Sequence, residues 1–367
     1  MPVNKLNMKL YVLQHIIQRI LFNLFCNFAG SKEKTMINYC TRIDIPKSVF
    51  DIGYQDRLMF IGSCFADQTG LKMVEHGWDA CVNPFGVLYN PLSVATGCYR
   101  LLKPEPFVDS DLFEYNRLFH SFMHHGQFSG QSVEATLAKM NDSLAEAASY
   151  FSTMSCLVIT FGTAYVYRLK SDGRTVANCH KLPAAYFDRE LLTVDRIVGE
   201  WSVLLETIRS VNTSLKVIFT VSPIRHWKEG AHGNQISKSI LLLAEQTLVE
   251  KYPRLTSYFP SYELMMDELR DYRFYADDLL HPSKVAVDYI WERFCEAYLG
   301  NDVIDDLKEF EAIHRDIHHR PYHPSSASYK HFLMQTLLKI KRLKAKNSYI
   351  CTSKQEKEII DRLQELS

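Results

Sequence analysis

The sequence predicts an α/β fold built from βαβ units around a largely parallel sheet, and two observations support this class. First, short apolar runs alternate with longer segments whose apolar residues recur at helical spacing; the clearest runs are residues 58–61, 156–162 and 216–221. Second, each run ends in a small or polar cluster. The carboxyl ends of parallel strands meet at one edge of a sheet, so we expect the functional residues there.

Residues 57–75 predict a strand, a tight turn and a helix in direct succession. Residues 58–61 form the apolar run, Gly62 breaks it, and residues 67–75 show helical spacing. Ser63 lies between strand and helix, where backbone N–H groups and the helix dipole favour developing negative charge. Two interpretations stay open: Ser63 is a nucleophile for an acyl carbon, or it only caps the helix.

The composition sets wide bounds on function. The chain has 367 residues, of which 47% are hydrophobic, and this is enough for one large core or for two domains of ordinary size. Lys plus Arg and Asp plus Glu both number 42, so the formal net charge is zero. Nothing global therefore points to nucleic acid or to an acidic substrate.

The nine cysteines are odd in number, scattered along the chain and never spaced as Cys-x-x-Cys. This pattern is a poor disulfide framework and a poor zinc signature, so we expect reduced thiols and a cytoplasmic protein. Cys64 adjoins Ser63 and is either an activated thiol at a helix N-terminus or an inert buried side chain. No carboxylate or cysteine accompanies His120, His124 and His125 at useful spacing, so we expect no metal site.

The first 35 residues differ from the remainder of the chain. Residues 1–32 contain no acidic side chain, and apolar residues recur at helical spacing between positions 13 and 24. Polar residues interrupt the ~20-residue apolar length that a membrane span needs. Three interpretations remain: an export signal with its apolar part at 21–29, an amphipathic helix at 1–30 in contact with a membrane, or a leader before a true start at Met36. We favour the last.

Two further segments carry turn signals. Residues 80–82 predict a second short strand, and the loop that leaves it contains Asn83 and Gly86. Gly86 lets a backbone N–H approach a ligand closely, or it serves only a tight turn. Residues 165–169 and 175–177 predict a small hairpin.

A base for Ser63 is found near residue 280. Asp278 stands three residues before His281, in a loop followed by a predicted helix at 284–298. This spacing lets the carboxylate accept from imidazole Nδ1 and fixes the tautomer whose Nε2 takes the serine proton. A loop histidine that caps a helix would show the same spacing. Together with Ser63 at a strand end, the pair favours a serine hydrolase.

Several blocks of the sequence resemble one known family. They are residues 62–66 (GSCFA), 83–91 (NPFGVLYNP), 161–164 (FGTA), 176–181 (VANCHK), 219–226 (FTVSPIRH), 234–238 (NQISK), 271–275 (DYRFY) and 281–282 (HP). In order and wording they resemble the GSCFA domain family, which looks like a branch of the SGNH (GDSL-like) hydrolases. The resemblance covers about residues 36–341.

The resemblance implies a three-layer α/β/α, flavodoxin-like fold with a mostly parallel sheet of about five strands. It also implies serine-dependent ester hydrolysis without a metal or cofactor. We therefore expect a hydrolase-like domain at 36–300 after a leader or misassigned extension at 1–35. A helical extension would follow at 301–367, with its last residues, 352–367, frayed or loosely docked.

By position, the resemblance assigns Ser63 as the nucleophile, with Asp278 and His281 as its acid–base partners. Gly86 would match the loop glycine whose N–H stabilises the oxyanion, together with the backbone N–H of Ser63 or Cys64.

The third SGNH block departs from the usual pattern. It commonly reads Gly-x-Asn-Asp, with the Asn completing the oxyanion hole, whereas this chain has Gly162 followed by Thr163, Ala164 and Tyr165. Losing one oxyanion donor costs on the order of 10² to 10³ in kcat. Thr163, Asn83 or Asn178 would have to replace the missing donor.

Three functions follow from these residues. The first is an esterase on a small-molecule or O-acylated carbohydrate ester, the second an acyltransferase with the same covalent intermediate, and the third a binding module with a decayed site. Arg225, His226 and Lys238 would bind an anionic or polyhydroxyl substrate, or else form ion pairs and caps on the rim.

Overall fold

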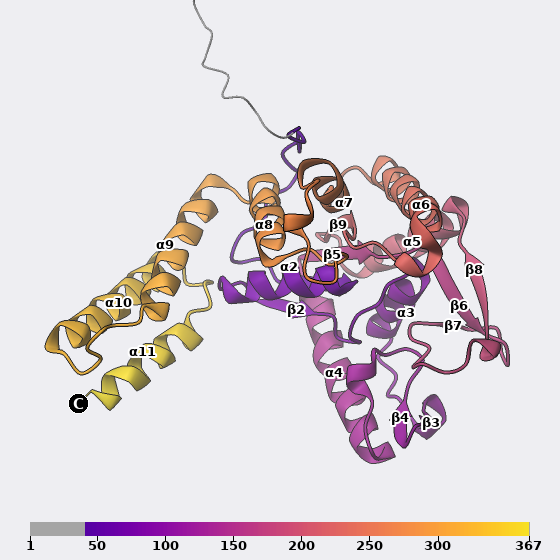
Figure 1. The fold of residues 1–367 in the computed structure, drawn as a ribbon, viewed down its shortest axis with the longest axis horizontal. Coiled ribbons are helices and arrows are strands. Elements are labelled where there is room, and N and C mark those ends of the chain that lie inside the picture. The colour runs from indigo at the N-terminus through magenta and orange to yellow at the C-terminus, as the bar shows by residue number, and fades with distance from the viewer. Residues whose placement is uncertain (1–40, 367) are drawn as a thin grey trace, which may run out of the picture. The chain divides into compact units, whose positions relative to one another are not determined.

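A five-stranded parallel sheet forms the centre of the computed structural model, which describes residues 41–366 (Figure 1). The sheet and the helices around it belong to the unit that begins at Ile43. Neighbouring strands all run parallel. In sheet order they are β10 (Thr256–Tyr258), β9 (Lys216–Val221), β5 (Cys156–Phe161), β1 (Leu58–Gly62) and β2 (Ala80–Val82). The predicted α/β class with its parallel sheet is confirmed.

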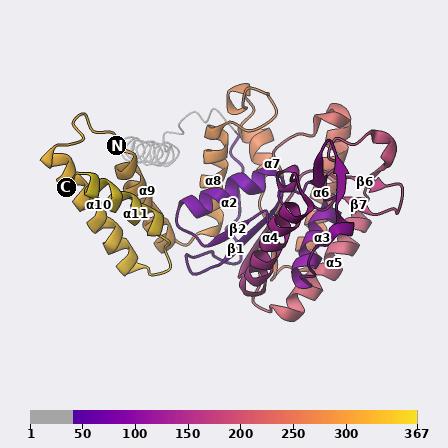
Figure 2. The same ribbon diagram turned by 90° about the horizontal axis from the view of Figure 1, so that it is seen from below.

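Alternate residues of each strand enter two cores, one on each face of the sheet. Met59 and Ile61 of β1 join one core, whereas Leu58 and Phe60 join the other. The first core is covered by α3 (Pro91–Leu102), α4 (Val133–Thr153), α5 (Val194–Val211) and α6 (Gly230–Lys251). The second is covered by α2 (Cys64–Glu75) and α8 (Lys284–Tyr298). Figure 2 shows α2 and α8 on one side of β1 and β2, with α3, α4 and α5 on the other, so the three-layer expectation is confirmed.

The strand order defines where a ligand would bind. Counted along the chain, the five strands lie in the order 2-1-3-4-5, which is the flavodoxin-like arrangement. The order reverses between β1 and β5, and ligands of open α/β sheets bind beyond the carboxyl ends of the strands at such a point. Ser63 follows β1 and Gly162 follows β5, so both lie at the reversal.

Two small antiparallel sheets are inserted into the chain. One is the hairpin of β3 (Phe113–Tyr115) and β4 (Leu118–His120). The other joins β6 (Tyr165–Leu169) to β7 (Thr175–Val176) and β8 (Phe187–Leu191). The predicted hairpin is thus present, and β8 adds a third strand that the sequence pattern did not indicate.

Three helices end the described chain, shown in orange and yellow in Figure 1: α9 (Asn301–His318), α10 (Ala327–Lys346) and α11 (Ser353–Glu365). They join the core beneath α2 and α8, and Phe310, Ile340 and Ile359 are at most 1% exposed. The expectation that residues 352–367 are loosely docked is wrong, because α11 buries Ile359 and its Arg362 donates to the Ile317 carbonyl at 2.5 Å.

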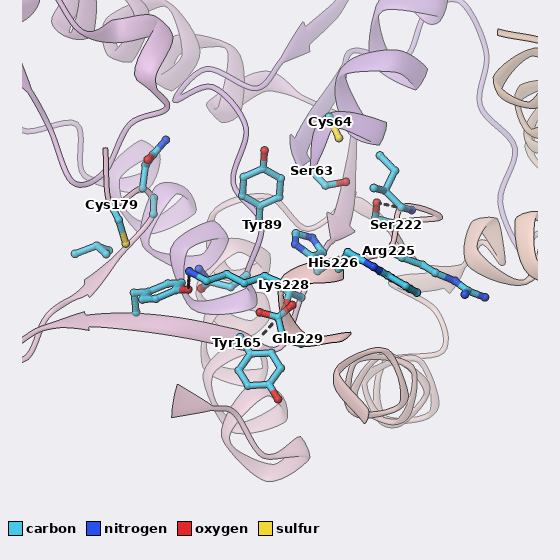
Figure 3. A pocket seen from close by; sticks show the side chains of 18 of the residues that line it. Ser63, Cys64, Tyr89, Tyr165, Cys179, Ser222, Arg225, His226, Lys228 and Glu229 are labelled. Carbon is cyan, nitrogen blue, oxygen red and sulfur yellow. Dashed lines mark hydrogen bonds between the residues drawn. The ribbon is translucent and has the colours of Figure 1, made fainter. Parts of the chain in front are cut away.

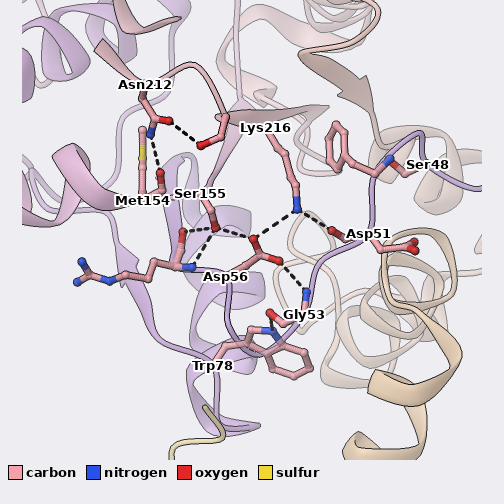
Figure 4. A network of polar contacts seen from close by, with 12 residues as sticks. Ser48, Asp51, Gly53, Asp56, Trp78, Met154, Ser155, Asn212 and Lys216 are labelled. Carbon is pink, nitrogen blue, oxygen red and sulfur yellow. Dashed lines mark hydrogen bonds and ion pairs between the residues drawn. The ribbon is translucent and has the colours of Figure 1, made fainter. Parts of the chain in front are cut away.

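A network of polar contacts closes the amino edge of the sheet (Figure 4). Asp56 accepts from Ser155 Oγ at 2.7 Å and from the Gly53 N–H at 2.8 Å, and it pairs with Lys216 Nζ at 3.4 Å. Asp56 and Ser155 precede β1 and β5, and Lys216 begins β9. The network therefore ties three central strands together at the edge away from Ser63.

The expectations for residues 1–35, namely a leader, an export signal or a membrane contact, lie outside the described residues. Between residues 41 and 366, no helix combines the length and apolarity that crossing a bilayer requires. The expected division at residue 300 falls between α8 and α9 and stays a prediction.

Candidate active site

A cavity of about 500 Å³ opens beyond the carboxyl ends of β1, β5 and β9 (Figure 3). Tyrosine and apolar side chains of the β6–β8 sheet cover one side of it. The predicted site residues that line this cavity are Ser63, Cys64, Thr163, Asn178, Arg225, His226 and His281. Gly86, Asn83 and Lys238 do not line it, and Asp278 reaches it only through His281.

Ser63 is the N-cap of α2 and has 1% of its surface exposed. Its Oγ accepts from the Phe65 N–H at 3.3 Å, which is long for this type of hydrogen bond. The two interpretations of Ser63 therefore describe one position, because the hydroxyl that caps the helix also lines the cavity. Its proton is not used by the cap and stays available. Figure 3 shows Ser63 above the His226 ring, with Tyr89 beside them.

Gly62 lets the chain turn toward Ser63. Its φ is +150°, and a Cβ built on it would lie 2.2 Å from the Thr160 carbonyl oxygen of the neighbouring strand. No side chain fits at this approach between β1 and β5, which is the physical reason for a glycine before the serine. The Gly62 N–H donates to Asn83 Oδ1 at 2.8 Å and fixes the turn.

Asp278 and His281 form the predicted pair. Asp278 Oδ2 contacts His281 Nδ1 at 2.5 Å, and Oδ1 accepts from the backbone N–H groups of His281 and Leu280 at 2.9 Å each. These hydrogen bonds, led by the one from the His281 backbone, hold the pKa of Asp278 at about 2. An ionised carboxylate makes Nδ1 the donor and leaves Nε2 as the acceptor. The Ala276 N–H closes the loop on the His281 carbonyl at 2.7 Å.

His281 and Ser63 line the same cavity, but within residues 41–366 no hydrogen bond joins their side chains. Contacts between nucleophile and base are often long in an enzyme without substrate and shorten in the complex. The cavity thus holds both groups that proton transfer requires, and their direct contact is a prediction for the bound state.

Three predicted oxyanion donors are engaged elsewhere. The Gly86 N–H donates to the Asn83 carbonyl at 2.7 Å in a turn. The Asn83 side chain accepts from Gly62 and donates to Asp67 Oδ1 at 2.6 Å. The Ser63 N–H is also used, because it donates to the Thr160 carbonyl at 3.1 Å. In this structure Gly86 therefore closes the turn after β2, the Asn83 side chain fixes the β1–α2 turn, and neither residue lines the cavity.

Two other predicted oxyanion donors, Cys64 and Asn178, line the cavity. Cys64 is the first residue of α2, and an N–H in the first turn has no acceptor inside its helix. Asn178 Oδ1 accepts from the His180 N–H at 2.8 Å, which leaves its Nδ2 as the donor end at the cavity. Thr163 is less suited, because its Oγ1 already contacts Ser237 Oγ at 3.1 Å.

Burial sets the charge of two further cavity residues. It raises the pKa of the Cys64 thiol to about 11, with the Asp67 carboxylate adding to the rise. It lowers the pKa of His226 to about 4, with Lys238 and His281 adding to the fall. At neutral pH both side chains are uncharged, so Cys64 is the inert thiol of the two alternatives and His226 is a neutral imidazole.

Lys238 lies beneath the cavity and is 0% exposed. Its Nζ donates to the Gly162 carbonyl at 2.8 Å and to the Ser222 carbonyl at 2.7 Å. Burial lowers its pKa to about 7, against an opposing effect of Glu245. Lys238 thus joins the carboxyl ends of β5 and β9 and does not meet the cavity, which corrects the expectation that it binds substrate.

Sequence reasoning missed the aromatic residues of the cavity. Tyr89, Tyr165 and Trp227 all line it. Trp227 directly follows His226 and is 52% exposed. The sequence shows that Trp227 follows a strand-end histidine, but its exposure is known only from the structure.

The fold and cavity define a class of protein: a flavodoxin-like α/β protein with a serine, a histidine and a carboxylate at the carboxyl edge of its sheet. The model described as the GSCFA family matches residues 57–294, which is more than half of the chain, and the chain belongs to this family. A second model, described as GSCFA domain protein, C-terminal domain, matches residues 310–365. No curated protein and no solved structure matches the chain.

Proposed function

We propose that the protein is a metal-independent serine hydrolase of the SGNH type that cleaves a small-molecule or carbohydrate ester through an acyl-enzyme on Ser63. One observation carries the proposal: Ser63, at the N-terminus of α2, and His281, whose Nδ1 is held by Asp278, line one cavity. These are the nucleophile, base and orienting group that acyl transfer requires.

Acylation begins when His281 Nε2 takes the proton of Ser63 Oγ and the oxygen attacks the ester carbonyl carbon. The Asp278 carboxylate stabilises the imidazolium, and its low pKa keeps it ionised. The Cys64 N–H and Asn178 Nδ2 donate to the oxyanion, which lies at the positive end of the α2 dipole. The carbon–oxygen bond to the alcohol then breaks, and the proton on His281 passes to the departing alkoxide.

Deacylation repeats these steps with water. His281 takes a proton from water, the hydroxide attacks the acyl carbon, and the bond to Ser63 Oγ breaks as the proton returns to it. An acceptor alcohol in place of water would give an acyltransferase, so product analysis with added alcohol separates the two reactions.

The test is hydrolysis of a short-chain aryl acetate by the wild type and three variants. Ser63→Ala and His281→Ala are expected to lower kcat by about 10³-fold or more. Ser222→Ala is the matched control, because this buried serine lines the same cavity after β9. It should keep most of the activity. Equal losses in all three variants, or no turnover by the wild type, would contradict the proposal.

We also propose that the protein works in a reducing compartment such as the cytoplasm. The cysteines of the described chain support this, since Cys64, Cys81, Cys98, Cys156, Cys179, Cys295 and Cys351 are all free thiols. Fractionation of cells that express the full chain should find it in the cytosol, and recovery outside the cytoplasm would contradict this location.

A further inference from the structure

A second cavity of about 580 Å³ adjoins the first. Arg225 and Trp227 line both of them. The second cavity also includes Asp278, Leu279 and Leu280, the three residues that precede His281. The catalytic loop therefore stands at the boundary between two binding spaces.

The position of His281 suggests which part of an ester each space holds. In the proposed mechanism His281 gives its proton to the alcohol oxygen, so the alcohol must depart on the side of the loop. His281 itself lines the first cavity, and Arg225 and Trp227 line both cavities, so the remainder of the alcohol extends from His281 past these two residues into the second cavity. The first cavity has apolar walls, among them Val176, Leu182 and Phe187, which suit an acyl group.

Arg225 lines the second cavity and forms no ion pair with a carboxylate within residues 41–366. Asp278, the acid among the described residues that line the second cavity, serves the His281 loop, and Asp267, next in the chain to Met266, pairs with Arg270 at 3.1 Å. Within residues 41–366 the one hydrogen-bond acceptor of the Arg225 guanidinium is the Met266 sulfur, at 3.3 Å from Nε and 3.0 Å from Nη2. A thioether is a weak acceptor, so most of the guanidinium donors stay free. Figure 3 shows this side chain extending away from Ser63.

The second cavity also presents aromatic faces. Tyr272 is 72% exposed and Trp227 is 52% exposed, and both line it together with Tyr275. Exposed aromatic rings beside a free guanidinium suit a ring that carries a negative charge, because the ring stacks while the anion receives paired N–H donors.

We propose that the second cavity binds the alcohol part of the ester, that this part is a ring bearing a carboxylate or phosphate, and that Arg225 determines specificity by binding the anion. The inference rests on the proposed function, since it assigns the two sides of the same ester. It adds a substrate class, an anionic ring-bearing alcohol, and a residue that selects it.

The kinetic test compares three acetate esters: 4-acetoxybenzoate, 4-acetoxyphenyl phosphate and the neutral methyl 4-acetoxybenzoate. Arg225→Gln should lower kcat/KM for an anionic ester by about 10- to 100-fold. The value for the neutral ester should change by less than about threefold. Arg273→Gln is the matched control, since this arginine is paired with Asp271 and lines neither cavity. The anionic ester whose kcat/KM falls more shows whether Arg225 is suited to a carboxylate or to a phosphate. Equal change for all three esters would overturn the proposal.

A binding measurement keeps this inference separate from catalysis. Of the four tryptophans only Trp227 is exposed, because Trp78, Trp201 and Trp291 are at most 5% exposed. In Ser63→Ala, 4-hydroxybenzoate or 4-hydroxyphenyl phosphate should change tryptophan emission with saturation, and adding Arg225→Gln should remove the change. This result would support the second cavity even if no ester were hydrolysed. No saturable change with either compound would overturn it.

Discussion

The buried amine of Lys238 leads to a prediction about how stability changes with pH. Its Nζ donates to the carbonyls of Gly162 and Ser222 and is shielded from water. Burial lowers its pKa from 10.5 to about 7 in the folded protein, whereas in the unfolded chain it returns to its ordinary value. Between these two values the unfolded chain binds a proton that the folded protein does not.

Stability must therefore rise with pH in this range, because it rises wherever the unfolded state binds more protons. The contribution of Lys238 to the free energy of unfolding should grow by about 2 kcal/mol between pH 7 and pH 9, at about 1.4 kcal/mol per pH unit once the folded amine is neutral. Below pH 7 the folded protein holds the charged form, and this gain is absent.

The assay is urea unfolding of the wild type and Lys238→Met at pH 7, 8 and 9. Other groups titrate in both proteins, so the difference between their unfolding free energies isolates Lys238. Burial raises the pKa of Glu245 well above its usual range, and this carboxyl is coupled to Lys238. Both proteins are therefore also compared in a Glu245→Gln background. The destabilisation caused by Lys238→Met should increase with pH by about 2 kcal/mol. A constant difference across this range would refute the reasoning, because it would mean that the folded protein keeps the Lys238 proton.

Three further predictions concern single residues. Asp278→Asn should lower kcat on an aryl ester by about 10³- to 10⁴-fold, since the carboxylate fixes the histidine tautomer; an unchanged kcat would remove it from the catalytic set. Gly86→Ala should lower the free energy of unfolding by more than about 1 kcal/mol in urea, because the Gly86 φ is +73° and a Cβ there would lie 2.4 Å from the His125 Cβ. The control is Gly126→Ala, whose Cβ would meet nothing within 4 Å and which should leave the free energy of unfolding unchanged. At pH 7.5 iodoacetamide should alkylate the exposed Cys351 and spare Cys64, because a pKa of about 11 keeps Cys64 a thiol. Peptide mass mapping checks this, and finding Cys64 modified before Cys351 would contradict it.

The main sheet was predictable wherever a strand is buried on both faces. Strands β1, β5 and β9 have continuous apolar runs, and each ends in a small or polar residue that marks the edge of the sheet. The edge strand β10 was missed because Thr256, Ser257 and Tyr258 carry no such run. The strand β8 was missed for the same reason, since only its first residue, Phe187, is buried.

The site was predictable where short spacing decides the geometry. Asp278 and His281 are three residues apart and meet within one loop. Gly86 illustrates the limit, because its turn and positive φ are readable from sequence, whereas the acceptor of its N–H is not. The place of Lys238 also depended on tertiary packing, since nothing local indicates that α6 directs it under two strand ends.

The C-terminal helix α11 shows why an amphipathic segment can look unattached. Most of its residues are polar, and its docking depends on Ile359 and on partners in α9 and α10. Its apolar residues, Ile359, Ile360 and Leu363, stand on one side of a charged helix. This pattern predicts an amphipathic helix, but it does not say which surface covers the apolar side. The packed core that receives it is formed by segments distant in sequence.

The most direct test of the central claim is to find which residue reacts with a fluorophosphonate. The wild type is treated with the probe, its intact mass is measured, and the modified peptide is mapped, with Ser63→Ala and Ser222→Ala treated in parallel. We predict one adduct on Ser63, retained in Ser222→Ala and absent from Ser63→Ala. An adduct that persists in Ser63→Ala, or a wild type that takes up no probe, would contradict the assignment of Ser63 as the nucleophile.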